Sequence, residues 1–257
     1  MPPPASVQLF CTCLVNELFP QVGVAAVEIL ESLGIRVGFP RDQTCCGQPL
    51  YNSGFWEEAR RVARHNLDLL SRTQGPIIVP SGSCADMMVH QCPELFQGDE
   101  KWRSVAEEVA GRCHELSQFL VDVLHWSPAT AASARQPGRR RKVAYHPSCH
   151  LLRGLGVKTQ PLDLLKAVVG VELAAVDRSE ECCGFGGMFS VKQPSISGAM
   201  LDQKCTALEN SGADTLVSCD MGCLLHLQGG LRRRGSKIQV CHLAQLLNGD
   251  TGSGKQP

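Results

Sequence analysis

Short apolar runs alternate with amphipathic stretches in the first third of the chain. The runs, at residues 7–13, 35–39 and 76–80, are short and partly bounded by glycine or proline, which is typical of buried strands. In the amphipathic stretches, residues 22–33 and 55–70, apolar positions recur at helical spacing. This part of the sequence therefore predicts strands that alternate with helices.

The same alternation begins again near residue 142. Its predicted strands lie at residues 142–146, 171–176, 215–217 and 238–240, and its predicted helices at 161–169, 195–210 and 242–247, with another helix opening at 219–223. Strands that alternate with helices are typical of an α/β fold with a mostly parallel sheet. We therefore predict two pseudo-symmetric repeated domains, each a small, mostly parallel sheet with flanking helices.

The segment between the two patterns sets the expected domain boundaries. Residues 101–126 have helical character, and the residues that follow them are rich in Ala, Ser and Pro, as a linker would be. We expect a first domain at 1–126, a linker at 127–142 and a second domain at 143–247. The last residues, 248–257, are expected to be disordered.

Composition and charge exclude several classes of function. The chain has 25 Lys plus Arg and 25 Asp plus Glu, so its formal net charge is zero, and we expect neither nucleic-acid binding nor attraction to an anionic membrane. No apolar run is long enough to span a bilayer, and residues 1–6 lack the features of a secretory signal. We expect a cytoplasmic protein, in which fourteen cysteines indicate metal or redox chemistry rather than a disulfide framework.

The spacing of the cysteines repeats along the chain. There are 31 residues between Cys13 and Cys45 and 32 between Cys149 and Cys182. The adjacent pairs at 45–46 and 182–183 are each followed by glycine, and the next repeated cysteine comes after 37 and 39 residues. An internal duplication explains this pattern. It yields eight candidate metal ligands, four in each half: Cys13, Cys45, Cys46 and Cys84, then Cys149, Cys182, Cys183 and Cys223.

All-thiolate ligand sets suit zinc or iron–sulfur clusters. Zinc sites usually take cysteines in close Cys-x2-Cys pairs, whereas the order here is single, adjacent pair, single, which favours a cluster. The glycines after each pair would let backbone N–H groups approach cluster sulfur. We therefore expect two iron–sulfur clusters, one in each half, with a zinc-stabilised scaffold as the alternative.

Two motifs carry a family resemblance. They are Pro-Ser-Gly-Ser-Cys at residues 80–84 and His-Pro-Ser-Cys-His at 146–150, each combined with a Cys-Cys-Gly turn. From residue 7 to residue 247 the chain resembles the cysteine-rich Cys-Cys-Gly domain family, and within it the lactate-utilisation protein A branch. The resemblance implies an iron–sulfur electron-transfer subunit that acts with a ferredoxin-like iron–sulfur subunit and a further small subunit to oxidise L-lactate to pyruvate.

The chain departs from the fuller family motif, which ends in Cys-x2-Cys. Met87 and His226 stand at that offset from Cys84 and Cys223. Four cysteines per half imply two ordinary [4Fe–4S] clusters, whereas five-cysteine relatives resembling heterodisulfide reductase act on disulfides. Cys219 keeps this catalytic alternative open for the second site, and Cys11 is an alternative to Cys13, although the repeat favours the latter.

Other residues and motifs complete the sequence-based assignment. Three histidines flank the predicted ligands and could donate to cluster sulfur, ligate iron or occupy structural positions: His146, His150 and His226. Four cysteines without a repeat partner are interpreted as small buried hydrophobic residues: Cys92, Cys113, Cys205 and Cys241. No dinucleotide, phosphate-loop or nucleophile-elbow motif is present, so hydride chemistry would belong to another subunit.

Overall fold

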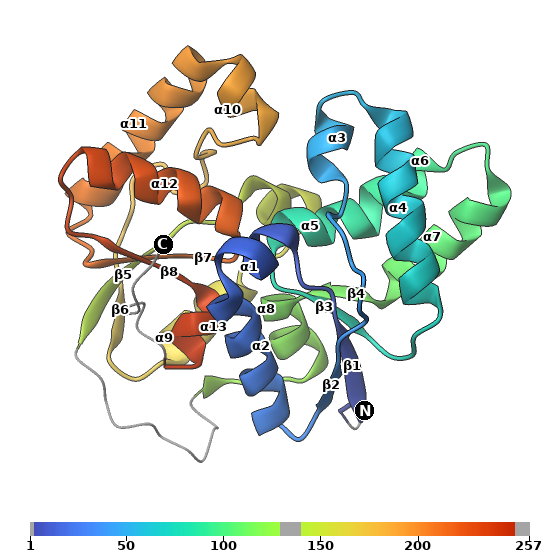
Figure 1. Cartoon of the computed structure of the whole chain (residues 1–257). Coiled ribbons are helices and arrows are strands. Elements are labelled where there is room, and N and C mark those ends of the chain that lie inside the picture. The colour runs from blue at the N-terminus through green and yellow to red at the C-terminus, as the bar shows by residue number, and fades with distance from the viewer. Residues whose placement is uncertain (1–2, 129–139, 250–257) are drawn as a thin grey trace.

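The computed structural model describes residues 3–128 and 140–249 and contains two four-stranded sheets (Figure 1). Their strand orders are β2-β1-β3-β4 and β6-β5-β7-β8, and every neighbouring pair is parallel. The strands are β1 (Ser6–Leu9), β2 (Arg36–Gly38), β3 (Ile77–Val79), β4 (Cys113–Glu115), β5 (Arg141–Tyr145), β6 (Val171–Leu173), β7 (Thr215–Ser218) and β8 (Gln239–His242). The predicted α/β architecture with two repeated units is confirmed.

Helices connect the strands and flank both sheets, with more helices between β3 and β4 than between β7 and β8. The first half contains α1 (Cys13–Leu18), α2 (Pro20–Ser32), α3 (Gln48–Asn52), α4 (Trp56–Ser71), α5 (Gly82–Asp86), η1 (Met87–Gln91), α6 (Cys92–Leu95), α7 (Glu100–Arg112), α8 (Leu116–Gln118) and η2 (Phe119–Val123). The second contains η4 (His150–Gly154), α9 (Gln160–Ala167), α10 (Met188–Lys192), α11 (Pro194–Asn210), α12 (Met221–Arg233) and α13 (Leu243–Leu247). The β3 and β7 strands are buried along their whole length because strands pair on both sides of them and helices cover the sheets.

One part of the predicted organisation was wrong. Residues 101–126 were expected to be helical, but β4 interrupts them and pairs with β3. Cys113 and Glu115 point into the protein, and Glu115 accepts hydrogen bonds from the backbone N–H groups of Ser117 and Gln118, which starts α8. A three-residue strand is too short to leave a period-two signal, so tertiary pairing determines this element.

The two halves pack tightly against each other. One hydrophobic core contains Val7 and Ile78 from the first half together with Val143 and Leu216 from the second. Helix α13 packs against α2, and the Gly82 N–H donates a hydrogen bond to the carbonyl oxygen of Cys219 across the boundary, at 3.1 Å. The carboxyl ends of the two sets of strands are therefore brought together.

Some expectations fall at or beyond the limits of the described residues. Most of the predicted linker, residues 129–139, lies outside them, as do residues 250–257 of the predicted tail. The final two residues assigned to that linker begin β5. Within the described part of the chain, no helix combines the length and the apolar content needed to cross a bilayer.

Candidate metal centre

All eight predicted cysteine ligands line one cavity of about 220 Å³ between the two halves. We call Cys13, Cys45, Cys46 and Cys84 the first quartet, and Cys149, Cys182, Cys183 and Cys223 the second quartet. In Figure 1, the helices that follow the two Cys-Cys-Gly turns lie above the helices that carry the last cysteine of each quartet, α3 above α5 and α10 above α12. The sequence predicts two separate sites; the structure brings both quartets to a shared cavity.

The first quartet comes from three helix-start regions of the first half. Cys13 is the first residue of α1, Cys84 lies in the first turn of α5, and the adjacent pair lies in the loop before α3. The thiol of Cys45 hydrogen-bonds with those of Cys13 and Cys46, and the thiol of Cys46 with that of Cys84. The four sulfurs therefore form one continuous chain of contacts.

The second quartet repeats this arrangement. Cys149 immediately precedes η4, and Cys223 lies in the first turn of α12. The thiol of Cys182 contacts those of Cys149 and Cys183, and Cys183 contacts Cys223. The order of contacts is the same as in the first quartet, so the repeat seen in the sequence is also a repeat in space.

In each quartet one thiol is strongly acidified. Hydrogen bonds from neighbouring thiols lower the pKa of Cys45 to about 3 and that of Cys182 to about 2. The same contacts raise the pKa of Cys46 and of Cys183, since these thiols act as donors and are also buried. Each quartet thus contains one thiol that ionises more readily than its neighbour in the cysteine pair, and a metal would displace the protons of the thiols that it binds.

The glycine after each cysteine pair has a defined structural role. Gly47 and Gly184 have φ of 95° and 89°, a region that favours glycine. Their N–H groups donate to the Sγ atoms of Cys45 and Cys182, both at 3.4 Å. A Cβ on Gly184 would lie only 2.8 Å from the Ser197 carbonyl oxygen. These glycines let backbone donors approach the sulfurs, as an anionic centre requires.

Different side chains hold the two cysteine-pair loops in place. In the first half, buried Asn66 on α4 donates from Nδ2 to the Cys45 carbonyl at 2.8 Å and accepts from the Thr44 N–H at 3.0 Å. In the second half, Lys204 on α11 donates from Nζ to the carbonyls of Arg178 and Ser179, at 2.8 and 3.1 Å. A neutral amide in one half corresponds to an amine in the other.

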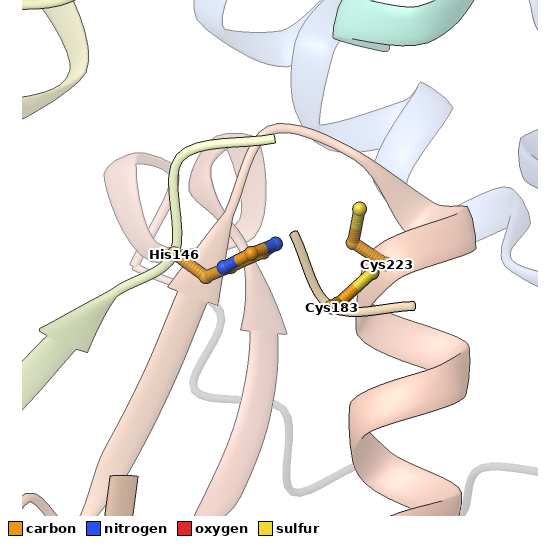
Figure 2. Close-up of side chains that lie close together, drawn as sticks. All are labelled: His146, Cys183 and Cys223. Atoms are coloured by element: carbon orange, nitrogen blue, oxygen red, sulfur yellow. The ribbon is translucent and has the colours of Figure 1, made fainter. Parts of the chain in front are cut away.

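His146 faces the second quartet from the end of β5 (Figure 2). One ring nitrogen and the sulfurs of Cys183 and Cys223 lie within 4.8 Å of one another, and all three residues are buried. Neither ring nitrogen has a hydrogen-bond partner among the described residues, and burial lowers the pKa of His146 to about 4. A neutral, buried and unpartnered imidazole is suited to bind a metal or to donate to a sulfur ligand.

Two carboxylates connect the halves beside the cavity. Asp220 accepts from the Gly222 N–H at 3.0 Å, which caps α12, and also from the Ser83 N–H of α5 at 2.9 Å. Asp86 contacts His150 Nδ1 at 2.6 Å and His90 Nδ1 at 2.8 Å. Burial opposes the ionisation of Asp86, but the hydrogen bonds from these histidines outweigh it and lower its pKa. Asp220 of the second half therefore binds a helix of the first, and Asp86 of the first half binds an imidazole of the second.

The remaining candidate residues lie farther from the cavity. Cys219 is fully buried at 3.7 Å from the Tyr145 hydroxyl and is not among the residues that line the cavity. Cys11 packs beside α2 and likewise lies outside the lining. The His226 ring packs at a tilt against Phe185, with ring centroids 5.8 Å apart. These positions favour four cysteines per quartet, with Cys13 rather than Cys11.

The residues present fit an iron–sulfur centre in each half. Each quartet supplies four thiols, a glycine N–H directed at a sulfur, and a position inside a largely apolar cavity. The cysteine spacing alone could not reveal Asn66, Lys204, Asp86 or Asp220, because their contacts depend on the fold. Aligning the two repeats could have matched Asn66 with Lys204, since they follow Cys45 and Cys182 by 21 and 22 residues.

The family model described as a cysteine-rich domain matches twice, at residues 7–89 and 143–228. Lactate utilization protein A from an Exiguobacterium strain is 46% identical over 244 residues, covering 95% of this chain and 97% of that protein. The protein of the same name from a Geobacillus strain is 45% identical over 242 residues, covering 94% and 98%. Lactate utilization protein A 2 from Bacillus cereus is 43% identical, covering 94% and 97%.

A solved structure also shares the fold. A hypothetical protein from Helicobacter pylori superposes with a TM-score of 0.62 at 13% sequence identity. The match covers 98% of this chain and 50% of that one, so this chain spans about half the length of that protein. At this level of identity the similarity extends to the fold alone.

Proposed function

This chain belongs to the lactate utilization protein A family of cysteine-rich domain proteins, and on that premise we propose that it is an iron–sulfur electron-transfer subunit of an enzyme that oxidises L-lactate to pyruvate. The observation that carries the proposal is the pair of equivalent cysteine quartets on one cavity. The first and second quartets would each hold one [4Fe–4S] cluster. Such a cluster supplies reversible one-electron transfer.

The surrounding residues suit that role. The N–H groups of Gly47 and Gly184 donate to sulfur and so stabilise its negative charge. Asp220 fixes the start of α12 against the start of α5, which limits the movement of Cys223 relative to Cys84. A rigid, partly dry site reduces the reorganisation that accompanies a change of charge.

The lactate assignment is supported by the names of relatives that are 43–46% identical over nearly their whole length. The partners we propose are a ferredoxin-like iron–sulfur subunit and a further small subunit.

All fourteen cysteines lie in the described residues and none forms a disulfide, which is consistent with a reducing cytoplasm.

Anaerobic purification tests the cofactor assignment. Iron and acid-labile sulfide assays should find both elements, and EPR of the reduced protein should give iron–sulfur signals. The complex reconstituted with its partner subunits should reduce an artificial acceptor when given L-lactate, and Cys45→Ala or Cys182→Ala should abolish this activity. An iron-free chain that supports the same activity would contradict the proposal.

A zinc-stabilised scaffold is the second candidate, because His146, Cys183 and Cys223 could also hold zinc. Stoichiometric zinc without absorbance near 400 nm would favour it. A catalytic subunit that reduces disulfides is less well supported, since Cys219 lies outside the cavity lining. Disulfide turnover that is lost in Cys219→Ser would favour that reaction instead.

A further inference from the structure

We propose that the second half holds its metal centre at a more positive reduction potential than the first, and that Lys204 and His146 set this difference. The inference rests on the proposed function, because it presupposes an iron–sulfur centre in each half. It depends on two positions where the repeated fold places different chemistry beside equivalent cysteines.

The first pair of equivalent positions is Asn66 and Lys204. Each is the eleventh residue of the second helix after its Cys-Cys-Gly turn, α4 or α11, and each donates to a backbone carbonyl of the loop that carries that turn. Both side chains are buried, with Lys204 only 4% exposed. The two residues therefore have the same structural task, but only one can carry a positive charge.

Hydrogen bonds from Lys204 Nζ to the carbonyls of Arg178 and Ser179 place its amine beside the loop that leads to Cys182 and Cys183. Burial lowers the pKa of Lys204, while Glu181 and these two cysteines favour its charged form, and its two carbonyl acceptors suit an ammonium donor. Reduction adds one negative charge to an iron–sulfur centre, so a nearby buried cation stabilises the reduced state. The neutral amide of Asn66 provides no such stabilisation in the first half.

The second pair of equivalent positions is Phe10 and His146. Each lies three residues before the first cysteine of its quartet, and their N–H groups donate to corresponding strands, to Ile78 of β3 at 2.9 Å and to Val217 of β7 at 2.8 Å. Phe10 is fully buried and His146 is 1% exposed. The structural position is the same, but the first half fills it with an apolar ring.

His146 has an unmet hydrogen-bonding capacity directed at the second quartet. Both of its ring nitrogens are buried without a partner among the described residues, and the ring lies beside Cys183 and Cys223 (Figure 2). A neutral imidazole can donate one N–H to sulfur or offer one lone pair to iron. Hydrogen bonds to cluster sulfurs shift the reduction potential, and histidine in place of cysteine raises it.

The acidic neighbour Asp220 does not reverse this asymmetry. Its carboxylate accepts from the N–H groups of Gly222, Cys223 and Ser83 and from the Ser81 hydroxyl, so four donors offset its charge. It also contacts both α5 and α12, which carry one cysteine from each quartet. Its negative charge acts on Cys149 and Cys223 of the second quartet, and the four donors reduce this effect.

Pulsed EPR on the unmodified chain tests the order of the two potentials. Protein labelled with [15N]histidine would be reduced stepwise, and nitrogen couplings recorded for each signal as it appears. His146 and His150 both belong to the second half, and the histidines that line the cavity or face its thiols are these two. We expect imidazole coupling on the signal that appears first, at the more positive potential. Coupling confined to the second signal would overturn the proposal.

Substitutions then test the two residues. Lys204→Gln and His146→Phe should each shift the more positive potential in the negative direction and leave the other potential nearly unchanged, while Lys204→Arg should stay close to wild type. Lys158→Gln is the matched control, since it removes a 63% exposed cation paired with Glu180 in the loop that Lys204 holds. Unchanged potentials in Lys204→Gln and His146→Phe with normal iron content would overturn the assignment to these residues.

The two hypotheses fail in different ways. A wild-type chain without iron contradicts the proposed function itself. A chain with two iron–sulfur signals in the reverse order, or with potentials insensitive to both substitutions, contradicts only this inference. If a variant loses its iron, the labelled wild-type measurement still decides the order.

Discussion

The two halves share a scaffold but differ in the residues behind their cysteines. In both, a four-stranded parallel sheet directs four cysteines and one glycine N–H toward the common cavity. Behind the first quartet lie Phe10 and Asn66, whereas His146 and Lys204 occupy the equivalent places behind the second. The repeat therefore preserves the ligand geometry, while neighbouring positions are free to differ in charge and hydrogen bonding.

Replacing the glycine of each cysteine-pair turn should have the largest effect on stability, and an unequal one. Gly184→Ala combines strain at φ of 89° with a Cβ 2.8 Å from the Ser197 carbonyl, so it should cost about 3 to 5 kcal/mol of unfolding free energy. At Gly47 the nearest atom is 3.6 Å from the added Cβ, and Gly47→Ala should cost about 1 to 2 kcal/mol. Urea unfolding measures both; equal costs would show that packing around the two turns is equivalent.

Loss of the helix caps should be the next largest effect. Asp220→Ala removes the acceptor for α12 and for the Ser83 N–H, so we expect a loss of about 2 to 3 kcal/mol. In the first half, Ser81→Ala removes the acceptor of a longer hydrogen bond from the Cys84 N–H, at 3.5 Å, and the hydrogen bond from the Ser81 hydroxyl to Asp220. We expect this variant to lose about 1 kcal/mol of unfolding free energy. Thermal or urea unfolding of the single variants would compare them; a larger loss in Ser81→Ala would contradict this ranking.

The halves should also respond to pH with opposite signs. Glu115 and His242 end the equivalent strands β4 and β8, and both are buried helix caps. Burial raises the pKa of Glu115 to about 7, so the folded state binds more protons and this contribution to stability is lost as pH rises from about 4.5 to 7. Burial lowers the pKa of His242 to about 4, so its contribution is lost as pH falls from about 6.5 to 4.

Urea unfolding across pH 4 to 8 measures these contributions, each on the order of 3 kcal/mol. Relative to wild type, Glu115→Gln should gain stability with rising pH, and His242→Gln should gain stability with falling pH. Subtracting the unfolding free energy of the wild type from that of the variant at each pH removes the contributions of the other titrating residues. A pH-independent difference for either variant would mean that its carboxyl or imidazole does not keep the shifted pKa.

The sequence predicted what depends on local pattern and on repeat spacing. Apolar runs at residues 76–80 and 215–217 were correctly assigned to strands, and the cysteine spacing predicted that each quartet would come together. It missed β4, because a three-residue strand is specified by its pairing with β3 and not by periodicity. It also missed the shared cavity, since the packing of one half on the other depends on contacts between distant residues such as Asp86 and His150.

Metal content in variants of each half tests the central claim, that the two quartets hold two separate centres although they line one cavity. The wild-type chain should contain about eight iron and eight sulfide, four of each per [4Fe–4S] cluster. Cys45→Ala and Cys182→Ala should each retain about four iron, with one of the two EPR signals lost and a different one in each variant. Complete loss of iron in both correctly folded variants would show that all eight cysteines serve a single centre, and would contradict the account.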